Sequence, residues 1–210
     1  MSSRSWSNGE FYYTITALQP EVTGSCIFVQ VHYPDGKITS FIVDCGMFQE
    51  AEYVQLNNQQ LPFKSSKIKF ALITHNHADH NGRLPVLVKE GFKGKIYCTN
   101  FTKKVMYYSL MDNYKIMMSN ARNKKQKVMY NETDINEVTA RTEGCEYEET
   151  IYLDERIKAT FFDNGHLPGA AMILVQISYY GKESFNLWFT GDYKEKSLWR
   201  ETAEIPEWVK

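Results

Sequence analysis

Three histidines and one aspartate are concentrated in the segment Thr74–His80. They follow the order His-x-His-x-Asp-His, and three of the chain's five histidines lie here. Imidazole and carboxylate groups are the usual ligands of zinc, manganese and iron sites, and their alternation can divide them between two adjacent ions. The segment therefore predicts a metal-binding loop, the alternative being a polar loop whose histidines only form hydrogen bonds. The candidate ligands are His75, His77, Asp79 and His80.

Two more candidate ligands follow apolar runs later in the chain, in Asn164-Gly165-His166 and Gly191-Asp192-Tyr193. Each alone would be explained as an ordinary polar or turn residue. Because the ends of the strands of one sheet gather at one edge, residues that are distant in sequence can converge there. We therefore expect one ion to be held by His75, His77 and His166 and the other by Asp79 and His80, with Asp192 bridging both through its two carboxylate oxygens.

Two divalent ions about 4 Å apart can lower the pKa of a bridging hydroxide and stabilise both oxygens of an in-line displacement at phosphorus. Hydrolysis is therefore the predicted reaction. Zinc suits these ligands best, and manganese and iron remain alternatives. Asp79 is a predicted catalytic residue, since it is a metal-site carboxylate on an exposed loop. Asp44 is a second one, because it ends an apolar run and could orient a ligand imidazole by accepting its free N–H, or else cap a strand before Gly46.

Length and composition favour a single domain over residues 1–210, with 43% apolar residues available for a core. The net charge of -1 neither supports nor excludes RNA as a partner. No run reaches the about 18 apolar residues of a membrane span. The cysteines form no Cys-x-x-Cys pair and no apolar leader precedes them, so we expect a reduced, cytoplasmic chain without a membrane segment. They are Cys26, Cys45, Cys98 and Cys145.

The elements that must position these residues alternate between strands and helices. The first part reads as a β-meander, followed by a short helical stretch, a buried strand that delivers the histidine loop, and then helix, strand and two further helices. The expected ranges are strands at Phe11–Leu18, Ser25–Tyr33, Ile38–Asp44, Ile68–Thr74 and Lys95–Thr99, and helices at Glu50–Gln59, Arg83–Lys89, Asn100–Asn120 with Asn100 as its cap, and from about Asn131 onward.

Strands resume in the last third of the chain and are separated by Asp-Glu, Gly-rich and Gly-Lys-Glu breaks. This predicts that the second half has a sheet of its own. With helices between the earlier strands, the fold class is α/β, and we expect a four-layer αββα sandwich. The expected strands are Thr150–Leu153, Ile157–Asp163, Ala171–Tyr180 and Phe185–Thr190.

Together these residues resemble the metallo-β-lactamase superfamily, in which an Asp at a strand end is followed by His-x-His-x-Asp-His, a later His and a later Asp. Four segments look most like the β-CASP branch, RNA-processing nucleases that include the pre-mRNA 3′-end cleavage endonuclease. The resemblance covers nearly the whole chain and implies a metal-dependent hydrolase acting on RNA, with Cys45 assigned no chemistry. The segments are Asp44–Gln49, Asn81–Pro85, Gly165–Ala171 and Phe189–Tyr193.

The resemblance also implies that the chain is an N-terminal portion. Members of the branch continue into an inserted β-CASP domain and then return to complete the fold, and Lys194–Lys210 looks like the run that leads to that insertion. The absent part would supply another histidine ligand for the second ion, a histidine that helps to protonate the leaving group, and much of the RNA-binding cleft. Only His32 remains here, and we expect it to be an ordinary sheet histidine. One firm and one weak metal site follow, and activity of the chain alone is left open.

Two further features have ordinary explanations that we favour. The basic run Arg122–Lys127 could contact phosphates, but a solvated helix end explains it. Tyr107, Tyr108 and Tyr114 could stack on bases, but their spacing suits packing of a long helix against the sheet.

Two rival functions stay open beside RNA cleavage. A hydrolase of a small ester, thioester or lactam would use the same metal centre with a different pocket. A non-catalytic RNA-binding or assembly module would keep the fold without turnover, although the sequence retains every expected ligand up to Asp192. Endonuclease or 5′-exonuclease action, RNA specificity and homo-oligomer formation are likewise left open by the sequence.

Overall fold

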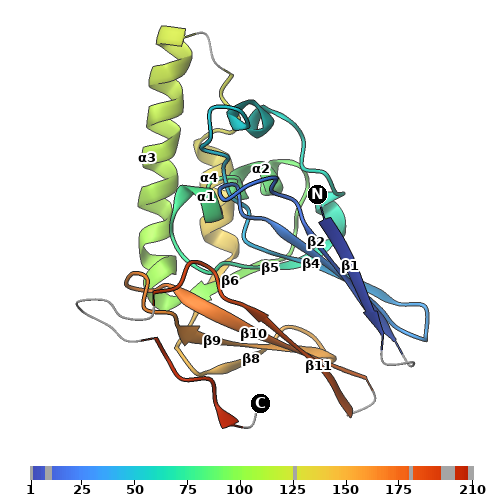
Figure 1. The fold of residues 1–210 in the computed structure, drawn as a ribbon. Helices are drawn as coiled ribbons and strands as arrows, with labels where there is room; N and C mark the ends of the chain where they lie inside the picture. Colours follow the sequence, from blue (N-terminus) through green and yellow to red (C-terminus); the bar gives the residue numbers. More distant parts are fainter. Residues whose placement is uncertain (1, 8–10, 125–126, 180–181, 195–201, 208–210) are drawn as a thin grey trace.

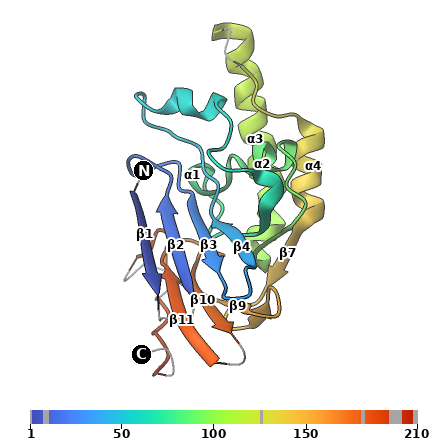
Figure 2. The ribbon, with the colours of Figure 1, turned by 90° about the vertical axis from the view of Figure 1, so that its right-hand side faces the viewer.

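Two β-sheets and one layer of helices make up the part of the chain that the computed structural model describes, which is residues 2–7, 11–124, 127–179, 182–194 and 202–207 (Figure 1). The larger sheet has seven strands and the smaller has four. The two sheets pack face to face, and the helices cover the other face of the larger sheet (Figure 2).

The larger sheet combines an antiparallel half with a parallel half. Its first four strands are joined in antiparallel fashion, which confirms the predicted meander. The other three add in parallel, each after a crossover connection. In their order across the sheet, the strands are β1 (Ser2–Ser7), β2 (Tyr12–Ala17), β3 (Ile27–His32), β4 (Ile38–Val43), β5 (Ile68–Leu72), β6 (Lys95–Thr99) and β7 (Thr142–Cys145).

Two strands of this sheet have no counterpart in the prediction. β1 is Ser-Ser-Arg-Ser-Trp-Ser and β7 is Thr-Glu-Gly-Cys, so neither carries the alternating apolar pattern that marks a strand. Both lie at the edges of the sheet, where β1 pairs with β2 and β7 with β6. Pairing with a neighbour therefore defines these strands, rather than their own composition.

Three of the four expected helices form as α-helices, one does not, and the short helix α1 was not predicted. The stretch predicted as a helix at Glu50–Gln59 forms only a short 3-10 helix at Val54–Asn58, and a second 3-10 turn covers Ser65–Lys67. The poor apolar periodicity of this stretch explains why no α-helix propagates there. The α-helices are α1 (Ala78–Asn81), α2 (Leu84–Lys89), α3 (Asn100–Lys124) and α4 (Glu132–Arg141).

The N-termini of the two longest helices are fixed in different ways. Asn131 caps α4, because its side chain accepts from the Asp134 N–H at 3.1 Å while the Asp134 carboxylate accepts from the Asn131 N–H at 2.9 Å. The predicted cap of α3, Asn100, is wrong. Thr99 Oγ1 accepts from the Thr102 N–H at 3.3 Å instead, and the Asn100 amide donates to Glu146 Oε1 at 2.6 Å.

The smaller sheet is antiparallel throughout and confirms that the second half of the chain has a sheet of its own. Its longest strand lies between two neighbours, and one edge is a strand of three residues. The strands, in their order across the sheet, are β11 (Lys182–Phe189), β10 (Ala171–Tyr179), β9 (Ile157–Asp163) and β8 (Thr150–Tyr152).

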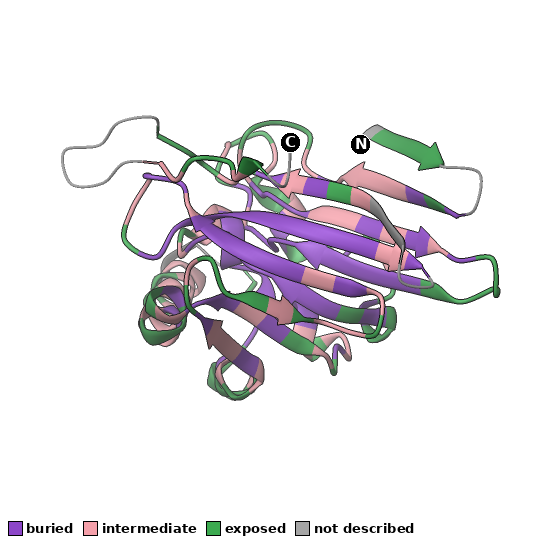
Figure 3. Ribbon diagram, turned by 90° about the horizontal axis from the view of Figure 1, so that it is seen from below, coloured by how far each residue is buried: buried purple, intermediate pink, exposed green. Residues whose placement is uncertain are grey.

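Two apolar cores hold the layers together, and alternation along the central strands supplies both. Phe41 and Val43 of β4 point into the core between the sheets, whereas Ile42 points into the core under the helices. The same alternation separates Phe70 from Ala71 in β5. Figure 3 shows that the central strands, β5, β9 and β10 among them, are buried over most of their length, whereas the edge strand β1 is exposed. The edge of the sheets to which β5 leads is therefore rigidly supported.

The described residues supply three layers of the expected αββα sandwich, namely helices, large sheet and small sheet. No α-helix of the described ranges lies on the outer face of the small sheet, where Phe162, Met172 and Leu174 form a separate apolar cluster with Trp188 and Ala203. None of the helices in these ranges combines the length and the apolar character that crossing a bilayer requires.

The structure separates the three tyrosines of α3. Tyr107 and Tyr114 pack against the core under the helices, as expected. The prediction is wrong for Tyr108, whose side chain is 72% exposed because it lies on the outer face of the helix. His32 is an ordinary sheet residue, and its ring stacks on Tyr12 with 4.4 Å between centroids.

The ends of the basic run are exposed, and the cysteines are buried thiols. Arg122 and Lys127 are exposed, and residues 125–126 of the run lie outside the described residues. All four cysteines are buried and free of disulfides.

Candidate metal centre

The candidate ligands lie where strands of both sheets end on the same side of the molecule. β5 leads into the first loop, β9 into the second and β11 into the third. The N–H of Ala171 donates to the Thr74 carbonyl at 2.8 Å, which ties the start of β10 to the end of β5. The loop predicted to run through position 80 is shorter than expected, because α1 begins at Ala78 inside the motif. These segments bring together His75, His77, Asp79, His80, His166 and Asp192.

Four of these residues form a compact set, called here the first group: His75, His77, His166 and Asp192. One ligand atom of each lies within 4.8 Å of all the others. His77 Nδ1 is 3.1 Å from His75 Nε2 and 3.4 Å from His166 Nε2. Asp192 Oδ2 is 4.0 Å from His75 Nε2 and 3.9 Å from His166 Nε2. Ligand atoms about 2.1 Å from a tetrahedral ion lie about 3.4 Å apart, so the first group fits one zinc-sized ion.

The first group is electrostatically suited to a cation. Burial, together with the nearby His80, His77 and His166, lowers the pKa of His75 to about 2. Burial and the neighbouring His77 also lower the pKa of His166. These two rings are therefore neutral near pH 7 and present nitrogen lone pairs to a common point, which is the protonation state that metal ligation requires.

Asp79, His80 and Asp192 form a looser set, called here the second group. His80 Nε2 is 3.3 Å from Asp192 Oδ1 and 3.9 Å from Asp79 Oδ2. Asp192 turns Oδ1 toward His80 and Oδ2 toward His75, so a single carboxylate lies between the two groups. The second group offers three candidate ligands where the first offers four.

Asp44 contacts the His80 ring on the side away from Asp192. Asp44 is buried, and its Oδ2 is 2.7 Å from His80 Nδ1. Burial alone would lower the pKa of His80, but the charge of Asp44 and its hydrogen bond, aided by Asp192 and Asp79, raise that pKa to about 9. With Nδ1 bonded to Asp44, the Nε2 of the ring faces Asp192, which is the geometry that an orienting role of Asp44 requires.

Thr74 completes this support, and the sequence analysis assigned it no role. Its N–H donates to Asp44 Oδ1 at 2.8 Å and its hydroxyl to Asp44 Oδ2 at 2.8 Å. The same hydroxyl oxygen lies 3.1 Å from His75 Nδ1. Thr74 therefore links the carboxylate behind the second group to a histidine of the first. No sequence signal marks this link, because position 44 is distant in the chain.

A second tie that the sequence did not indicate anchors the histidine loop to α3. Asn76 lies between the two histidines that open the motif, and its Oδ1 accepts from Ser109 Oγ at 2.9 Å. Asn81 Nδ2 donates to the same oxygen at 2.7 Å. The loop is thus held to α3 and to α1 at once.

Two glycines allow the loops of the centre to approach one another. A Cβ on Gly46 would lie 1.6 Å from the carbonyl oxygen of Asp79, so only glycine fits where the segment after β4 passes α1. Gly191 has a φ of +55°, and a Cβ there would lie 2.8 Å from the Cβ of Thr74. The close passage at Gly191 is what brings Asp192 between the two groups.

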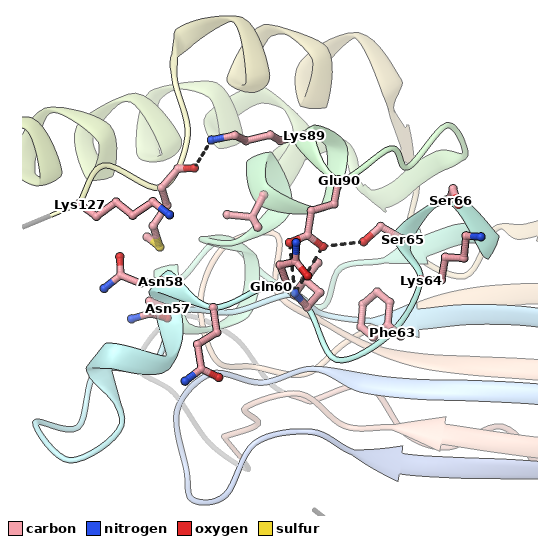
Figure 4. Close-up of a pocket in the computed structure, with 14 residues that line it drawn as sticks. Asn57, Asn58, Gln60, Phe63, Lys64, Ser65, Ser66, Lys89, Glu90 and Lys127 are labelled. Carbon is pink, nitrogen blue, oxygen red and sulfur yellow. Dashed lines mark hydrogen bonds between the residues drawn. The ribbon is translucent and has the colours of Figure 1, made fainter.

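A cavity of about 540 Å³ between residues 57–66 and α2 is a separate feature, and no candidate ligand lines it (Figure 4). Two of its charged side chains bond to the protein itself. Lys89 Nζ donates to the Met129 carbonyl at 2.8 Å, and Glu90 Oε2 accepts from Ser65 Oγ at 3.0 Å. We therefore give this cavity no part in the centre.

Known proteins resemble the chain over most of its length. Transcription termination factor FttA of Methanocaldococcus jannaschii is 30% identical over 89% of the chain, and endoribonuclease ysh1 of Aspergillus fumigatus is 30% identical over 90%. Ribonuclease TTHA0252 of Thermus thermophilus is 33% identical over 64% of the chain. The matched regions are 28%, 21% and 29% of these relatives, so the chain spans less than a third of each.

Among solved structures, the subclass B3 metallo-beta-lactamase MEM-A1 from a soil metagenome library is 18% identical to the chain, with a TM-score of 0.49. The match covers 88% of this chain and 61% of that one. The sequence profile described as the metallo-beta-lactamase superfamily matches residues 20–141, which is more than half of the chain. The region matched includes Asp44 and the whole His-x-His-x-Asp-His motif. The chain therefore belongs to the metallo-β-lactamase superfamily.

Proposed function

We propose that this chain is the metal-binding part of a ribonuclease that hydrolyses RNA phosphodiester bonds with two divalent ions. The observation that carries the proposal is the position of Asp192, which offers one oxygen to the first group and the other to the second. Such an arrangement suits two adjacent ions, the number used in phosphodiester hydrolysis. Two of the three relatives named above are ribonucleases by name, which supports RNA as the substrate.

The side chains divide the work in this proposal. The first group holds one ion, and Asp79 and His80 hold the other with Asp192 shared between them. Asp44 is a positioning residue, because it keeps His80 Nε2 directed at Asp192. When bound, the ions supply Lewis acidity at phosphorus and lower the pKa of the attacking water. Imidazole and carboxylate ligands favour zinc, and manganese is the alternative.

Metal content and hydrolysis test the proposal together. The chain is loaded with zinc or manganese, its bound metal is measured by elemental mass spectrometry, and it is incubated with labelled single-stranded RNA, a chromogenic lactam and a thioester. We expect about two ions per chain and cleavage of the RNA. Asp79→Asn should remove the cleavage. Glu155→Gln, an exposed carboxylate far from the centre in the fold, is the matched control and should retain it.

Other results of the same assay would favour other functions. Turnover of the thioester or lactam without RNA cleavage would contradict the ribonuclease and indicate a small-molecule hydrolase. RNA binding without turnover of any substrate, in a chain that carries its metal, would indicate a non-catalytic module. RNA cleavage that persists in Asp79→Asn would contradict the two-ion arrangement.

A further inference from the structure

Two of the loops that carry candidate ligands are flanked by exposed aromatic rings. Tyr193 directly follows Asp192, and its side chain is 65% exposed. Phe101, in the first turn of α3, is 48% exposed. Its ring lies against Gly169, three residues after His166, because a Cβ on that glycine would be 2.9 Å from Phe101 Cδ1. Large rings at such positions are only partly buried by the fold of the described residues and keep much of their surface open to solvent.

The helix that anchors the third loop, α3, also carries an exposed ring. Ser109 bonds to Asn76 in the middle of the histidine loop, and its neighbour Tyr108 is 72% exposed. Tyr107 and Tyr114 behave differently, since they pack on the core, with the Tyr114 ring 6.3 Å from that of Tyr130. Packing on the core therefore accounts for Tyr107 and Tyr114, whereas Tyr108 contacts only the edge of the Tyr107 ring, 5.6 Å between centroids, and leaves most of its own ring exposed.

Tyr108 and Phe101 belong to one exposed stripe of α3. The residues of this stripe, called here the α3 stripe, recur every three or four positions and so lie on one side of the helix. The stripe contains three cations and one anion, and it extends about 31 Å along the helix. In Figure 1, α3 starts beside the loop before β10 and leads away from the sheets. The α3 stripe consists of Phe101, Lys104, Tyr108, Asp112, Lys115, Ser119 and Arg122, all exposed.

We propose that the α3 stripe binds single-stranded RNA next to the metal centre, with bases stacked on Phe101 and Tyr108 and phosphates near Lys104, Lys115 and Arg122. This inference rests on the proposed ribonuclease function and names how its substrate is held. Every unpaired base has a face that can stack on an aromatic ring, and each lysine or arginine near the backbone adds salt-dependent affinity. Paired bases in a duplex cannot stack in this way, so single strands are selected.

The arrangement of rings and charges favours RNA over a protein partner. A contiguous exposed apolar patch is the feature that most often marks a protein-binding surface. Here Lys104 separates the two rings along the stripe, and Lys115 follows Tyr108 two turns later. The order ring, cation, ring in Phe101, Lys104 and Tyr108 suits stacked bases with a phosphate between them, and Lys115 and Arg122 offer further phosphate contacts despite the anion Asp112.

Binding of a labelled oligouridine tests the role of Tyr108. All proteins carry Asp79→Asn so that the RNA is not consumed, and affinity is measured by fluorescence anisotropy. Tyr108→Ala should weaken binding at least about 5-fold, because the stacked ring is lost. Tyr108→Phe should retain the affinity, since its ring still stacks. Tyr152→Ala is the matched control, because Tyr152 is 79% exposed on β8 of the small sheet, and it should leave binding unchanged.

An abasic oligomer with the same backbone separates stacking from charge. Tyr108→Ala should leave its binding unchanged, whereas Lys104→Ala should weaken both oligomers and reduce the salt dependence of binding by about 0.7 in the log–log slope. Equal melting temperatures of Tyr108→Ala and the parent protein would show that the fold is intact.

Failure of this inference differs from failure of the proposed function. If the parent chain cleaves RNA and Tyr108→Ala binds oligouridine as tightly as the parent, the α3 stripe is not the binding surface and the ribonuclease still stands. If the parent neither binds nor cleaves RNA, both are overturned.

Discussion

The two groups of candidate ligands differ in how the chain assembles them. The first group takes side chains from three loops, and its atoms meet within 4.8 Å. The second group consists of Asp79 and His80, which are neighbours on α1, and of Asp192, which it shares with the first group. The group assembled from distant segments is thus the more complete one. Ligands that are neighbours in sequence reach an ion from one side only. Loops at converging strand ends can place ligands on several sides of it.

The groups also differ in charge. The His75 imidazole of the first group is held neutral, since its pKa is lowered to about 2. His80 of the second group is held protonated in the metal-free chain, since its pKa is raised to about 9. An ion entering the second group must therefore displace a proton, whereas one entering the first group meets free lone pairs. Filling the first group before the second is the expected order.

The largest effect should come from Asp192, because it serves both groups. Asp192→Ala removes an oxygen ligand from each, so we expect bound metal to fall from about two ions per chain to fewer than one and RNA cleavage to fall more than about 100-fold. Elemental mass spectrometry and an RNA cleavage assay measure the two quantities. Glu155→Gln should change neither. Two ions per chain in Asp192→Ala would show that the groups do not share this carboxylate.

Substitutions confined to one group should show which of the two ions that group binds. Asp79→Asn should leave about one ion per chain and abolish turnover, with the free energy of unfolding changed by less than about 0.5 kcal/mol because the side chain is partly exposed on a short helix. His75→Ala should remove the tightly bound ion instead. Calorimetric zinc titration distinguishes these outcomes. Loss of both ions in Asp79→Asn would show that the first group cannot bind metal alone.

Asp44→Asn should weaken the second group without removing a ligand. Because the orientation of His80 depends on Asp44, zinc affinity of the weaker site should fall about 10- to 100-fold while the first site stays occupied. Ser25→Ala is a suitable control, since its hydroxyl makes only a long 3.4 Å contact with Asp44. If the zinc affinity of the weaker site is unchanged in Asp44→Asn, Asp44 does not position His80 and is only a strand-end cap.

The smallest effect concerns pH in the metal-free chain. The folded pKa of His80, about 9, exceeds the unfolded value of about 6.5, so its stabilising contribution is full below pH 6.5 and is lost as pH rises through 9. The folded pKa of His75, about 2, lies below that value, so stability is gained as pH rises toward 6.5. The free energy of unfolding of the metal-free chain should therefore be largest near pH 6.5. Each histidine should change it by at most about 1.4 kcal/mol per pH unit.

Urea denaturation in the presence of a chelator at pH 5, 6.5 and 9 measures this profile. His80→Gln should flatten the decline above pH 6.5 and leave the rise below it. Stability that increases from pH 6.5 to 9 would contradict the protonated state of His80 in the metal-free chain.

Much of the fold follows from local pattern. The meander, the buried strand before the histidine loop and the second sheet were all predicted, because alternation of apolar residues reports directly on sheet faces. β1 and β7 were not predicted, because pairing with a neighbouring strand, not an apolar pattern of their own, makes them strands. Tyr108 was wrongly grouped with Tyr107 and Tyr114, which are seven residues apart and share one side of α3, whereas Tyr108 is turned by about 100° from Tyr107 and lies outside the core.

The types of the metal ligands and the likeness to a metal-dependent superfamily follow from the amino-acid sequence, because histidine and aspartate at fixed spacing are characteristic of metal sites. The position of Asp192 between the two groups was predicted, but its distances to His75 and His80, and the link from Asp44 through Thr74 to His75, come from the folded chain. These contacts join segments that are 30 or more residues apart, and their distances depend on how the sheets pack. Local residue patterns do not predict how the sheets pack.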